Sequence, residues 1–307
     1  MQNKERPRII FMGTPEFAVA SLDAIIQAGY PVVAVITAPD KPAGRGMQLN
    51  LSAVKKYALD KGLKILQPEK LKNPQFLEEL QILQADLQIV VAFRMLPEQV
   101  WNMPPMGTVN LHGSLLPQYR GAAPINWAVI NGEKETGVTT FKLQHDIDTG
   151  NILLQDRFPI GEKETAGEVH DRMKEIGARL VVKTIEGLVA GTLTEQPQPM
   201  NLTLKHAPKI FTDTCRIDWT QNIENIYDLI RGLSPFPAAF TQLDGKLLKI
   251  YHSEKELKTP THEPGGYDTD KKTYLRFAAA DGYIHVTDIQ LEGKKRMPVK
   301  DFLMGWR

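Results

Sequence analysis

Residues 8–37 read RIIFMGTPEFAVASLDAIIQAGYPVVAVIT, and this stretch decides the fold. It begins with a short apolar run and ends with a run rich in valine. Between the two runs, Phe17, Leu22 and Ile25 recur at helical spacing, and Gly29 ends the pattern. The order strand, helix, strand predicts a βαβ unit whose two strands are parallel and buried.

The same alternation continues through the first half of the chain. Apolar runs at 87–93 and 108–112 predict two further strands, each followed by a loop. Strands that alternate with helices indicate an α/β domain over roughly residues 1–190, with a Rossmann-like, mostly parallel, doubly wound sheet. The predicted helices lie at 52–61, 74–84, 123–131 and 165–190.

The composition of the sequence changes after Gly191. The segment TLTEQPQPMNLTLKHAPK is polar, contains prolines and shows no hydrophobic periodicity. Such a segment is typical of an interdomain linker. Beyond it, AAFTQLDGKLLKIYH and YLRFAAADGYIHVTDIQLEG alternate apolar and polar residues around Asp-Gly pairs, which favour β-hairpin turns. The C-terminal third of the chain therefore predicts a small antiparallel β domain in the form of a partly open barrel.

Composition excludes binding of nucleic acid by bulk electrostatics. The chain has 307 residues, of which 42% are hydrophobic and 24% charged, as expected of a soluble globular protein with room for two domains. Its net charge is +1, and residues 205–307 carry 16 Lys and Arg against 14 Asp and Glu. Any contact with a polyanion must therefore come from local clusters of cations.

The lone Cys215 excludes an internal disulfide framework and a cysteine zinc site, and it fits a reducing compartment. We expect Cys215 itself to be structural. The apolar run near the N-terminus is only as long as a strand, so it does not predict a signal peptide, and no apolar stretch is long enough for a membrane helix. These features predict a cytoplasmic protein.

Three segments follow predicted strands and are expected where open α/β sheets bind ligands, beyond the carboxyl ends of the strands. They are VAFRMLP at 91–97, NLHGSLLP at 110–117 and DIDTG at 146–150. Strand alternation puts Asn110 and His112 on the same side of their strand. An amide beside an imidazole suits acyl chemistry, in which an oxyanion needs a hydrogen-bond donor and a proton moves between two nitrogens.

Asp146 and Asp148 are the carboxylates that we expect to orient this imidazole and raise its pKa, and Asp148 lies in a D-T-G turn that holds a side chain rigidly. No G-x-S-x-G motif surrounds Ser114, which favours direct transfer between two bound substrates over an acyl-enzyme. The alternative for His112 is a structural polar group. A metal site that joins His112, His145 and Asp148 lacks local ligand spacing.

The turn GTPEFA after the first predicted strand leaves two interpretations open. A glycine at a strand-to-helix turn brings backbone N–H groups near an anion, as in nucleotide-binding proteins. However, the turn lacks the G-x-G-x-x-G pattern, and Asp40 lies in the loop beyond the second strand rather than at its end. The alternative is a tight turn without a ligand.

The stretch NLHGSLLPQYRGAAPINWAVINGEKETGVT, followed by DIDTG, resembles the signature of the folate-dependent formyltransferases. The resemblance runs nearly end to end, through FMGTPEFAV, APDKPAGRGMQL, SPFP at 234–237 and a final GKKRM…DFL. It implies a formyl-transfer catalytic domain over 1–190, a linker over 191–208 and an OB-like, tRNA-binding domain over 209–307. It also implies 10-formyltetrahydrofolate as the formyl donor, and no metal.

The resemblance assigns roles to individual residues. Asn110, His112 and Asp148 match the family's catalytic residues. One segment departs from the family: where V-A-Y-G is usual, this chain has V-A-F-R-M-L-P and one residue fewer, so we expect a different shape for the pterin pocket. The expected folate contacts are Ser114, Leu115, Leu116 and Pro117, together with Phe93, Arg94 and Met95.

The loop TAPDKPAGRGMQLN at 37–50 is too long for an ordinary connection in an α/β domain, and it carries Lys41 and Arg45. It resembles the loop with which one branch of the family reaches the acceptor stem of initiator Met-tRNA, which is then the implied formyl acceptor. The other expected RNA contacts are Lys294, Lys295 and Arg296, on a domain of a type that often binds nucleic acid.

Alternatives to this assignment stay open. The cations of both regions are solvated surface charges if no RNA binds there. The one-domain members of the family, which formylate glycinamide ribonucleotide, are disfavoured by the C-terminal third, and the sugar-nucleotide members lack the A-G-R-G loop. A formyl-folate hydrolase, a sugar formylase and a silent RNA- or folate-binding protein are the remaining rivals.

Overall fold

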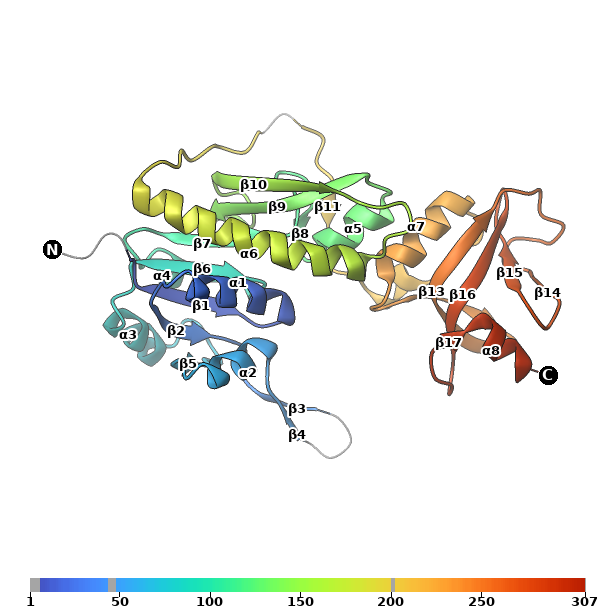
Figure 1. The fold of residues 1–307 in the computed structure, drawn as a ribbon, viewed down its shortest axis with the longest axis horizontal. Coiled ribbons are helices and arrows are strands. Elements are labelled where there is room, and N and C mark those ends of the chain that lie inside the picture. Colours follow the sequence, from blue (N-terminus) through green and yellow to red (C-terminus); the bar gives the residue numbers. More distant parts are fainter. Residues whose placement is uncertain (1–5, 44–47, 200–201, 307) are drawn as a thin grey trace. The chain divides into compact units, whose positions relative to one another are not determined.

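The computed structural model describes residues 6–43, 48–199 and 202–306, and Figure 1 draws their helices and strands. The chain divides into two compact units. The first runs to Arg120 and adds residues 137–157 and 171–205, and the second takes residues 121–136, 158–170 and the chain from His206 onward. No helix of the described part of the chain is long and apolar enough to cross a membrane.

A seven-stranded sheet forms the centre of the first unit, in the order β10-β9-β7-β6-β1-β2-β5. The ladders from β7 to β5 are parallel, whereas β9 runs antiparallel to β7. The predicted mostly parallel sheet is confirmed, and β9 and β10, which were not predicted, extend it. The strands are β1 (Ile9–Gly13), β2 (Val32–Ile36), β5 (Ile65–Leu66), β6 (Leu87–Val91), β7 (Thr108–His112), β9 (Glu135–Lys142) and β10 (Ile152–Pro159).

Helices cover both faces of this sheet, as a doubly wound fold requires. Ile10 and Met12 of β1 share a core with Phe76 of α3 on one face. On the other face, Leu111 of β7 lies directly against Gly177 of α6, and α1 lies on that face too (Figure 1). The helices are α1 (Glu16–Gln27), α2 (Ala53–Asp60), α3 (Pro74–Ile82), α4 (Glu98–Trp101) and α6 (Ala166–Ala190).

The first turn from strand to helix leaves no room for a side chain at Gly13. A Cβ atom there would lie 2.7 Å from the Ala18 Cβ of α1 and 2.9 Å from the Val91 carbonyl oxygen of β6. Close packing of helix and neighbouring strand therefore requires the glycine of GTPEFA. This packing accounts for the glycine without a bound ligand.

The second unit is built on an antiparallel sheet in the order β12-β13-β16-β15-β14, with β17 paired to β16. Asp244 and Gly245 connect β12 to β13 at φ of 50° and 76°, as a two-residue turn of this kind demands, and so the predicted hairpin is confirmed. The OB-like strands are β12 (Ala239–Leu243), β13 (Lys246–Glu256), β14 (Tyr267–Thr269), β15 (Leu275–Ala278), β16 (Tyr283–Leu291) and β17 (Met297–Pro298).

A helix that the sequence did not predict, α7 (Ile223–Leu233), completes the core of the second unit. Its Ile226 and Ile230 are buried in one cluster with Ile250 of β13 and Ile289 of β16. Asn222 caps its N-terminus by accepting a hydrogen bond from the Asn225 N–H. The remaining elements are β3 (Lys41–Ala43), β4 (Gln48–Asn50), β8 (Arg120–Gly121), α5 (Pro124–Ile130), β11 (His206–Ala207), a 3-10 turn (Thr212–Cys215) and α8 (Val299–Met304).

Candidate active site

Strand β7 presents Asn110 and His112 on one side, as its alternation predicts. Val109 and Leu111, on the other side, are fully or almost fully buried in the core. The Asn110 side chain is half-buried, and no described residue forms a hydrogen bond with its amide group. Asn110 can therefore donate to a bound molecule without giving up an internal partner.

The two ring nitrogens of His112 face different groups. Nε2 lies 2.9 Å from the Tyr119 carbonyl oxygen, and Nδ1 lies 3.9 Å from Oδ2 of Asp148. Because a carbonyl oxygen only accepts hydrogen bonds, Nε2 carries the hydrogen of the neutral ring and Nδ1 is left to take up a proton. The imidazole and the carboxylate are 7% and 12% exposed, so once the imidazole is protonated, water screens the attraction between the two groups only weakly.

Asp148 was the better of the two predicted carboxylates. Asp146 is exposed, whereas Asp148 lies beside the imidazole, in a turn where its φ is 54°. A non-glycine residue in this left-handed region costs about 1–3 kcal/mol and persists only where its surroundings fix it. His145 is exposed and pairs with Glu98 instead, at 3.8 Å. Among the described residues, no group of His, Cys, Asp and Glu is arranged to hold a metal ion.

Thr139 of β9 holds the loop at 114–117 through hydrogen bonds. The Thr139 hydroxyl donates to the Ser114 carbonyl oxygen at 2.7 Å and accepts from the Leu116 N–H at 3.1 Å. Gln155 of β10 donates to the Leu116 carbonyl oxygen at 2.9 Å. The Ser114 hydroxyl donates to the Gln118 carbonyl oxygen at 2.6 Å, so this predicted folate contact is already engaged within the protein.

The segment after β6 holds the other predicted folate contacts. The Arg94 guanidinium donates to the Pro68 and Glu69 carbonyl oxygens and lies over the Phe93 ring, 5.4 Å from its centroid. Its buried Nε has no partner among the described residues, and burial lowers the pKa of the Arg94 side chain. Met95, by contrast, is 72% exposed. Arg94 thus joins the V-A-F-R-M-L-P segment, which differs from the family pattern, to the loop before α3.

The long loop between β2 and α2 carries the first group of predicted RNA contacts. Lys41 begins β3 and is exposed, whereas Arg45 lies outside the described residues. Asp40 pairs with Lys55 of α2 and accepts a hydrogen bond from the Gln67 amide at 2.9 Å, and both contacts keep the pKa of Asp40 below its usual value. Asp40 is therefore engaged within the protein, which is an argument against its serving a nucleotide bound at the GTPEFA turn.

The other predicted RNA contacts lie in the turn between β16 and β17. Lys294 and Lys295 are exposed, and the described residues include no ion-pair partner for either ammonium group. Arg296 is different: it pairs with Asp288 at 2.5 Å and lies over the Tyr251 ring, 4.2 Å from its centroid. Its charge is already compensated, so Lys294 and Lys295 are the more accessible cations of this predicted group.

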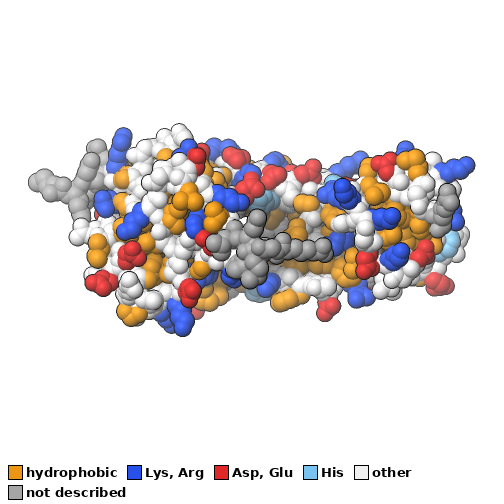
Figure 2. Space-filling view, turned by 90° about the horizontal axis from the view of Figure 1, so that it is seen from below, with side chains coloured by type: hydrophobic (Ala, Val, Ile, Leu, Met, Phe, Trp, Pro, Cys, Tyr) orange, Lys and Arg blue, Asp and Glu red, His pale blue; other side chains and the backbone are white. Residues whose placement is uncertain are grey.

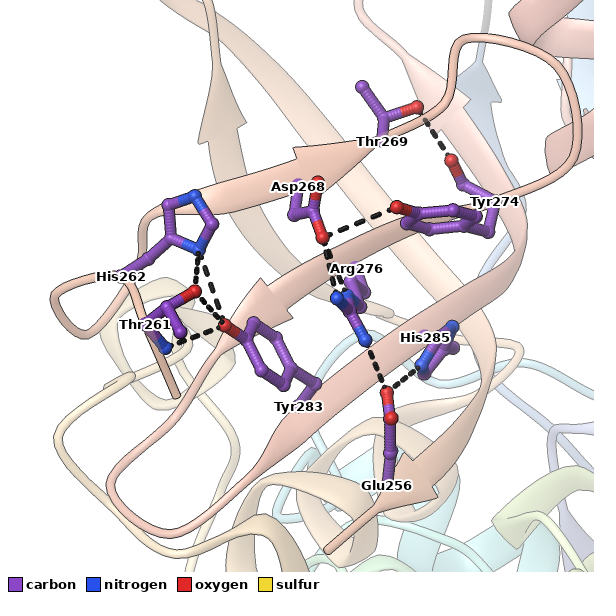
Figure 3. Close-up of polar contacts among 9 residues, drawn as sticks. All are labelled: Glu256, Thr261, His262, Asp268, Thr269, Tyr274, Arg276, Tyr283 and His285. Carbon is purple, nitrogen blue, oxygen red and sulfur yellow. Dashed lines mark hydrogen bonds and ion pairs between the residues drawn. The ribbon is translucent and has the colours of Figure 1, made fainter. Parts of the chain in front are cut away.

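A further polar network lies on the OB-like sheet and was not predicted (Figure 3). Arg276 donates to Glu256 and to Asp268, each at 2.6 Å, and its guanidinium lies over the Tyr283 ring, 4.2 Å from the centroid. His285 contacts the same Glu256 oxygen at 2.6 Å. Two carboxylates neutralise Arg276, so this network joins strands of the sheet rather than offering a cation to phosphate.

Sequence reasoning missed several groups that hold the predicted site together. Tyr119 contributes a backbone carbonyl, and Thr139 lies on a strand that was not predicted. Gln198, from the predicted linker, donates to the Asp148 and Gly150 carbonyl oxygens at 2.9 and 2.8 Å. A backbone acceptor leaves no residue-type signal, and a glutamine in a polar, proline-containing segment resembles any other surface glutamine.

Family profiles cover most of the chain. Residues 7–185 match the profile described as formyl transferase, and residues 209–307 match that described as formyl transferase, C-terminal domain. The methionyl-tRNA formyltransferase of Parabacteroides distasonis is 57% identical over 314 residues, which cover 99% of this chain and 97% of the relative. The match therefore includes both units and the segment between them.

Solved structures of other proteins share the fold. HypX from Aquifex aeolicus in complex with tetrahydrofolic acid aligns with a TM-score of 0.66 and 19% identity, over 97% of this chain and 47% of that one. The N-formyltransferase from Helicobacter canadensis, in complex with folinic acid and dTDP-3-aminofucose, aligns with a TM-score of 0.67 and 21% identity, over 91% of this chain and 98% of that one. At such identities the likeness concerns the fold alone.

Proposed function

Since the chain belongs to the formyl transferase family, we propose that it transfers the formyl group of 10-formyltetrahydrofolate to the α-amino group of methionine on initiator Met-tRNA. The observation that carries the proposal is the Asn110 amide, which has no partner among the described residues, beside His112, whose Nδ1 faces Asp148. The 57% identity to a methionyl-tRNA formyltransferase supports this acceptor. We place the reaction in the cytoplasm, where initiator tRNA is charged.

Asn110 and His112 stabilise the oxyanion in this mechanism. The methionine nitrogen forms a bond to the formyl carbon, and the bond from that carbon to the folate nitrogen then breaks. Asn110 and the protonated Nδ1 of His112 donate to the tetrahedral oxygen, and Asp148 stabilises the imidazolium. The attacking amine loses one proton and the leaving folate nitrogen gains one, so the reaction is balanced without a metal or an external base.

The folate is held, in this proposal, by residues 93–95 and 114–117, which follow β6 and β7 at one edge of the sheet. Residues 1–190 carry the transfer chemistry, and residues 209–307 bind tRNA after the linker 191–208.

Lys41 and Arg45 reach the acceptor stem. We expect Arg45→Ala to weaken productive use of tRNA and to leave folate affinity unchanged; a variant that loses folate affinity but not tRNA use contradicts this role of the loop.

An acceptor panel tests the reaction. Purified protein is incubated with labelled 10-formyltetrahydrofolate and, separately, with initiator Met-tRNA, a dTDP-amino sugar, free methionine and buffer alone. We expect label to move to Met-tRNA only. Transfer to the amino sugar would identify a sugar formylase, release of formate in buffer would identify a hydrolase, and absence of turnover with every acceptor would favour a silent binding protein.

Lys294 and Lys295 provide a test of RNA binding that is independent of chemistry. Each phosphate contact contributes about 0.7–0.9 to the slope of log affinity against log salt. Lys295→Ala is therefore expected to weaken tRNA binding and to make that slope shallower by about this amount. Lys258→Ala is the matched control, because Lys258 is also exposed on the second unit. Equal slopes of log affinity against log salt for the two variants would show that Lys295 does not contact the RNA.

A further inference from the structure

The segment after α6 runs along the edge of the candidate active site. Gln196 pairs with Ile152 at the start of β10, through two backbone hydrogen bonds of 2.8 and 2.9 Å. Ile152 lies two residues after the D-T-G turn that carries Asp148. We call residues 196–199 and 202–205 the strap. All the contacts described below lie within the first unit.

One end of the strap holds the turn that carries Asp148. The Gln198 side chain is 8% exposed, and its amide nitrogen donates to the Asp148 and Gly150 carbonyl oxygens at 2.9 and 2.8 Å. Its amide oxygen accepts from Arg120 Nη2 at 2.6 Å, which fixes the orientation of the amide. The left-handed φ of Asp148 is the kind of backbone strain that such surrounding contacts sustain.

The other end of the strap holds the residue that contacts His112. The Gln118 amide donates to the Thr203 carbonyl oxygen at 3.2 Å and accepts from the Lys205 N–H at 2.8 Å. The Tyr119 N–H donates to the Lys205 carbonyl oxygen at 2.6 Å. Tyr119, like Asp148, has a left-handed backbone, with φ of 58°, and its carbonyl oxygen is the partner of His112 Nε2.

We propose that the strap is part of the catalytic apparatus and that Gln198 and Gln118 are positioning residues, which set the spacing between His112 and Asp148 and the tautomer of His112. This inference rests on the proposed formyl transfer. The two members of the pair come from different loops, and each loop has a strained residue that the strap holds by direct hydrogen bonds. Neither glutamine touches the reacting atoms; both act through the residues that do.

Loss of the Gln198 contacts releases the Asp148 turn from one side. Displacement of a catalytic group by about 1 Å costs on the order of 100-fold in rate, so we expect Gln198→Leu to lower the single-turnover rate by about 10- to 100-fold. The affinity for folate is expected to change little, because within the described part of the chain the side-chain hydrogen bonds of Gln198 go to the Asp148 turn and to Arg120. Gln118→Leu tests the other end in the same way, should Gln198→Leu fold poorly.

The measurement pairs single-turnover kinetics with ¹⁵N-histidine NMR of the ligand-free full-length protein. In the wild type, the signals of the neutral His112 ring should show hydrogen on Nε2 and none on Nδ1. Gln118→Leu should produce a mixture of tautomers, and both glutamine variants should shift the pH profile of the rate. Gln242→Leu is the matched control, because Gln242 is an exposed glutamine on β12.

Two results would overturn the proposal. The first is a single-turnover rate within twofold of the wild type in both variants. The second is a loss of kcat/KM that comes from KM alone, with unchanged histidine signals. The proposed function can fail separately, because absence of transfer to Met-tRNA by the wild type leaves the NMR measurement intact. Mixed tautomers in Gln118→Leu would then still support the strap as the device that positions His112.

Discussion

At the scale of single residues, the sequence predicts which side chains share a face but not how each is oriented. Period-two alternation placed Asn110 and His112 together on β7, and the structure agrees. The tautomer of His112 depends instead on the Tyr119 carbonyl oxygen, which lies 2.9 Å from Nε2 and belongs to a residue with a left-handed backbone. No residue-type rule predicts a left-handed tyrosine, since this conformation is unfavourable for bulky side chains.

Thr139 offers a prediction at this scale. Its buried hydroxyl bonds with Ser114, Leu116 and Gln155, and valine has nearly the same shape without the hydroxyl. We expect Thr139→Val to lower the free energy of unfolding by about 1–3 kcal/mol, because buried polar groups are left unpaired, and to weaken folate binding. Denaturant unfolding and folate titration check the two effects.

Thr136→Val serves as the control for this prediction. Thr136 is buried on the same strand, but no described residue forms a hydrogen bond with its hydroxyl group. The control should change stability by less than Thr139→Val and should leave folate binding intact. Similar effects in both variants would mean that the hydroxyl network does not hold the 114–117 loop.

At the scale of helices and strands, hydrophobic period predicted most of the first unit. The structure has helices at Ala53–Asp60, Pro74–Ile82, Pro124–Ile130 and Ala166–Ala190, each within a few residues of its predicted range. Strand β9 escaped prediction because its buried core contains Thr136, Thr139 and Thr140, whose hydroxyls make the sequence look polar. Those of Thr139 and Thr140 are hydrogen-bonded inside the protein, which a sequence does not show.

Gly150 tests how tightly the end of the D-T-G turn packs on β9. A Cβ atom there would lie 1.7 Å from the Lys142 carbonyl oxygen, so the turn must move if alanine is introduced. We expect Gly150→Ala to cost about 1–3 kcal/mol of unfolding free energy and, because Asp148 moves with the turn, to slow transfer further than stability alone explains. Gly161→Ala is the control, since the nearest atom to its Cβ would be 3.5 Å away. Wild-type activity in Gly150→Ala would show that Asp148 does not depend on this packing.

At the scale of the whole molecule, the net charge is close to neutral, and positive and negative side chains are mixed on the surface. On the face drawn in Figure 2, Lys and Arg side chains are interleaved with Asp and Glu. The sequence correctly predicted an α/β sheet followed by an antiparallel OB-like sheet. It did not predict the Arg276 network, which joins side chains from different strands. It also did not predict α7, although Ile223, Ile226 and Ile230 recur at helical spacing after the capping residue Asn222.

The Arg276 network predicts how stability depends on pH. The hydrogen bond with His285 lowers the pKa of Glu256, and the hydrogen bonds from Arg276 lower the pKa of Asp268. A carboxylate with a depressed pKa stabilises the fold above its unfolded pKa, near 4, and loses that contribution as pH falls through the folded pKa. Wild-type stability should therefore fall from about pH 5 downward, and the network should contribute to the loss.

Glu256→Gln isolates this contribution. The variant should be less stable than the wild type at pH 7, and the gap between their denaturant midpoints should narrow toward pH 3. Amide hydrogen exchange in Leu275–Ala278 and Tyr283–Leu291 assigns the effect to the OB-like sheet. A gap that is constant from pH 7 to pH 3 would contradict the assignment of stability to this carboxylate.

The central claim is that Asn110 and His112 stabilise the oxyanion of formyl transfer. The most direct test is the single-turnover rate of formyl transfer from 10-formyltetrahydrofolate to initiator Met-tRNA, with both substrates saturating. Asn110→Ala should lower this rate by about 10²- to 10³-fold while both dissociation constants stay within about twofold, and Asn102→Ala, at an exposed asparagine, should match the wild type. A rate for Asn110→Ala within a few-fold of the wild type would contradict the account.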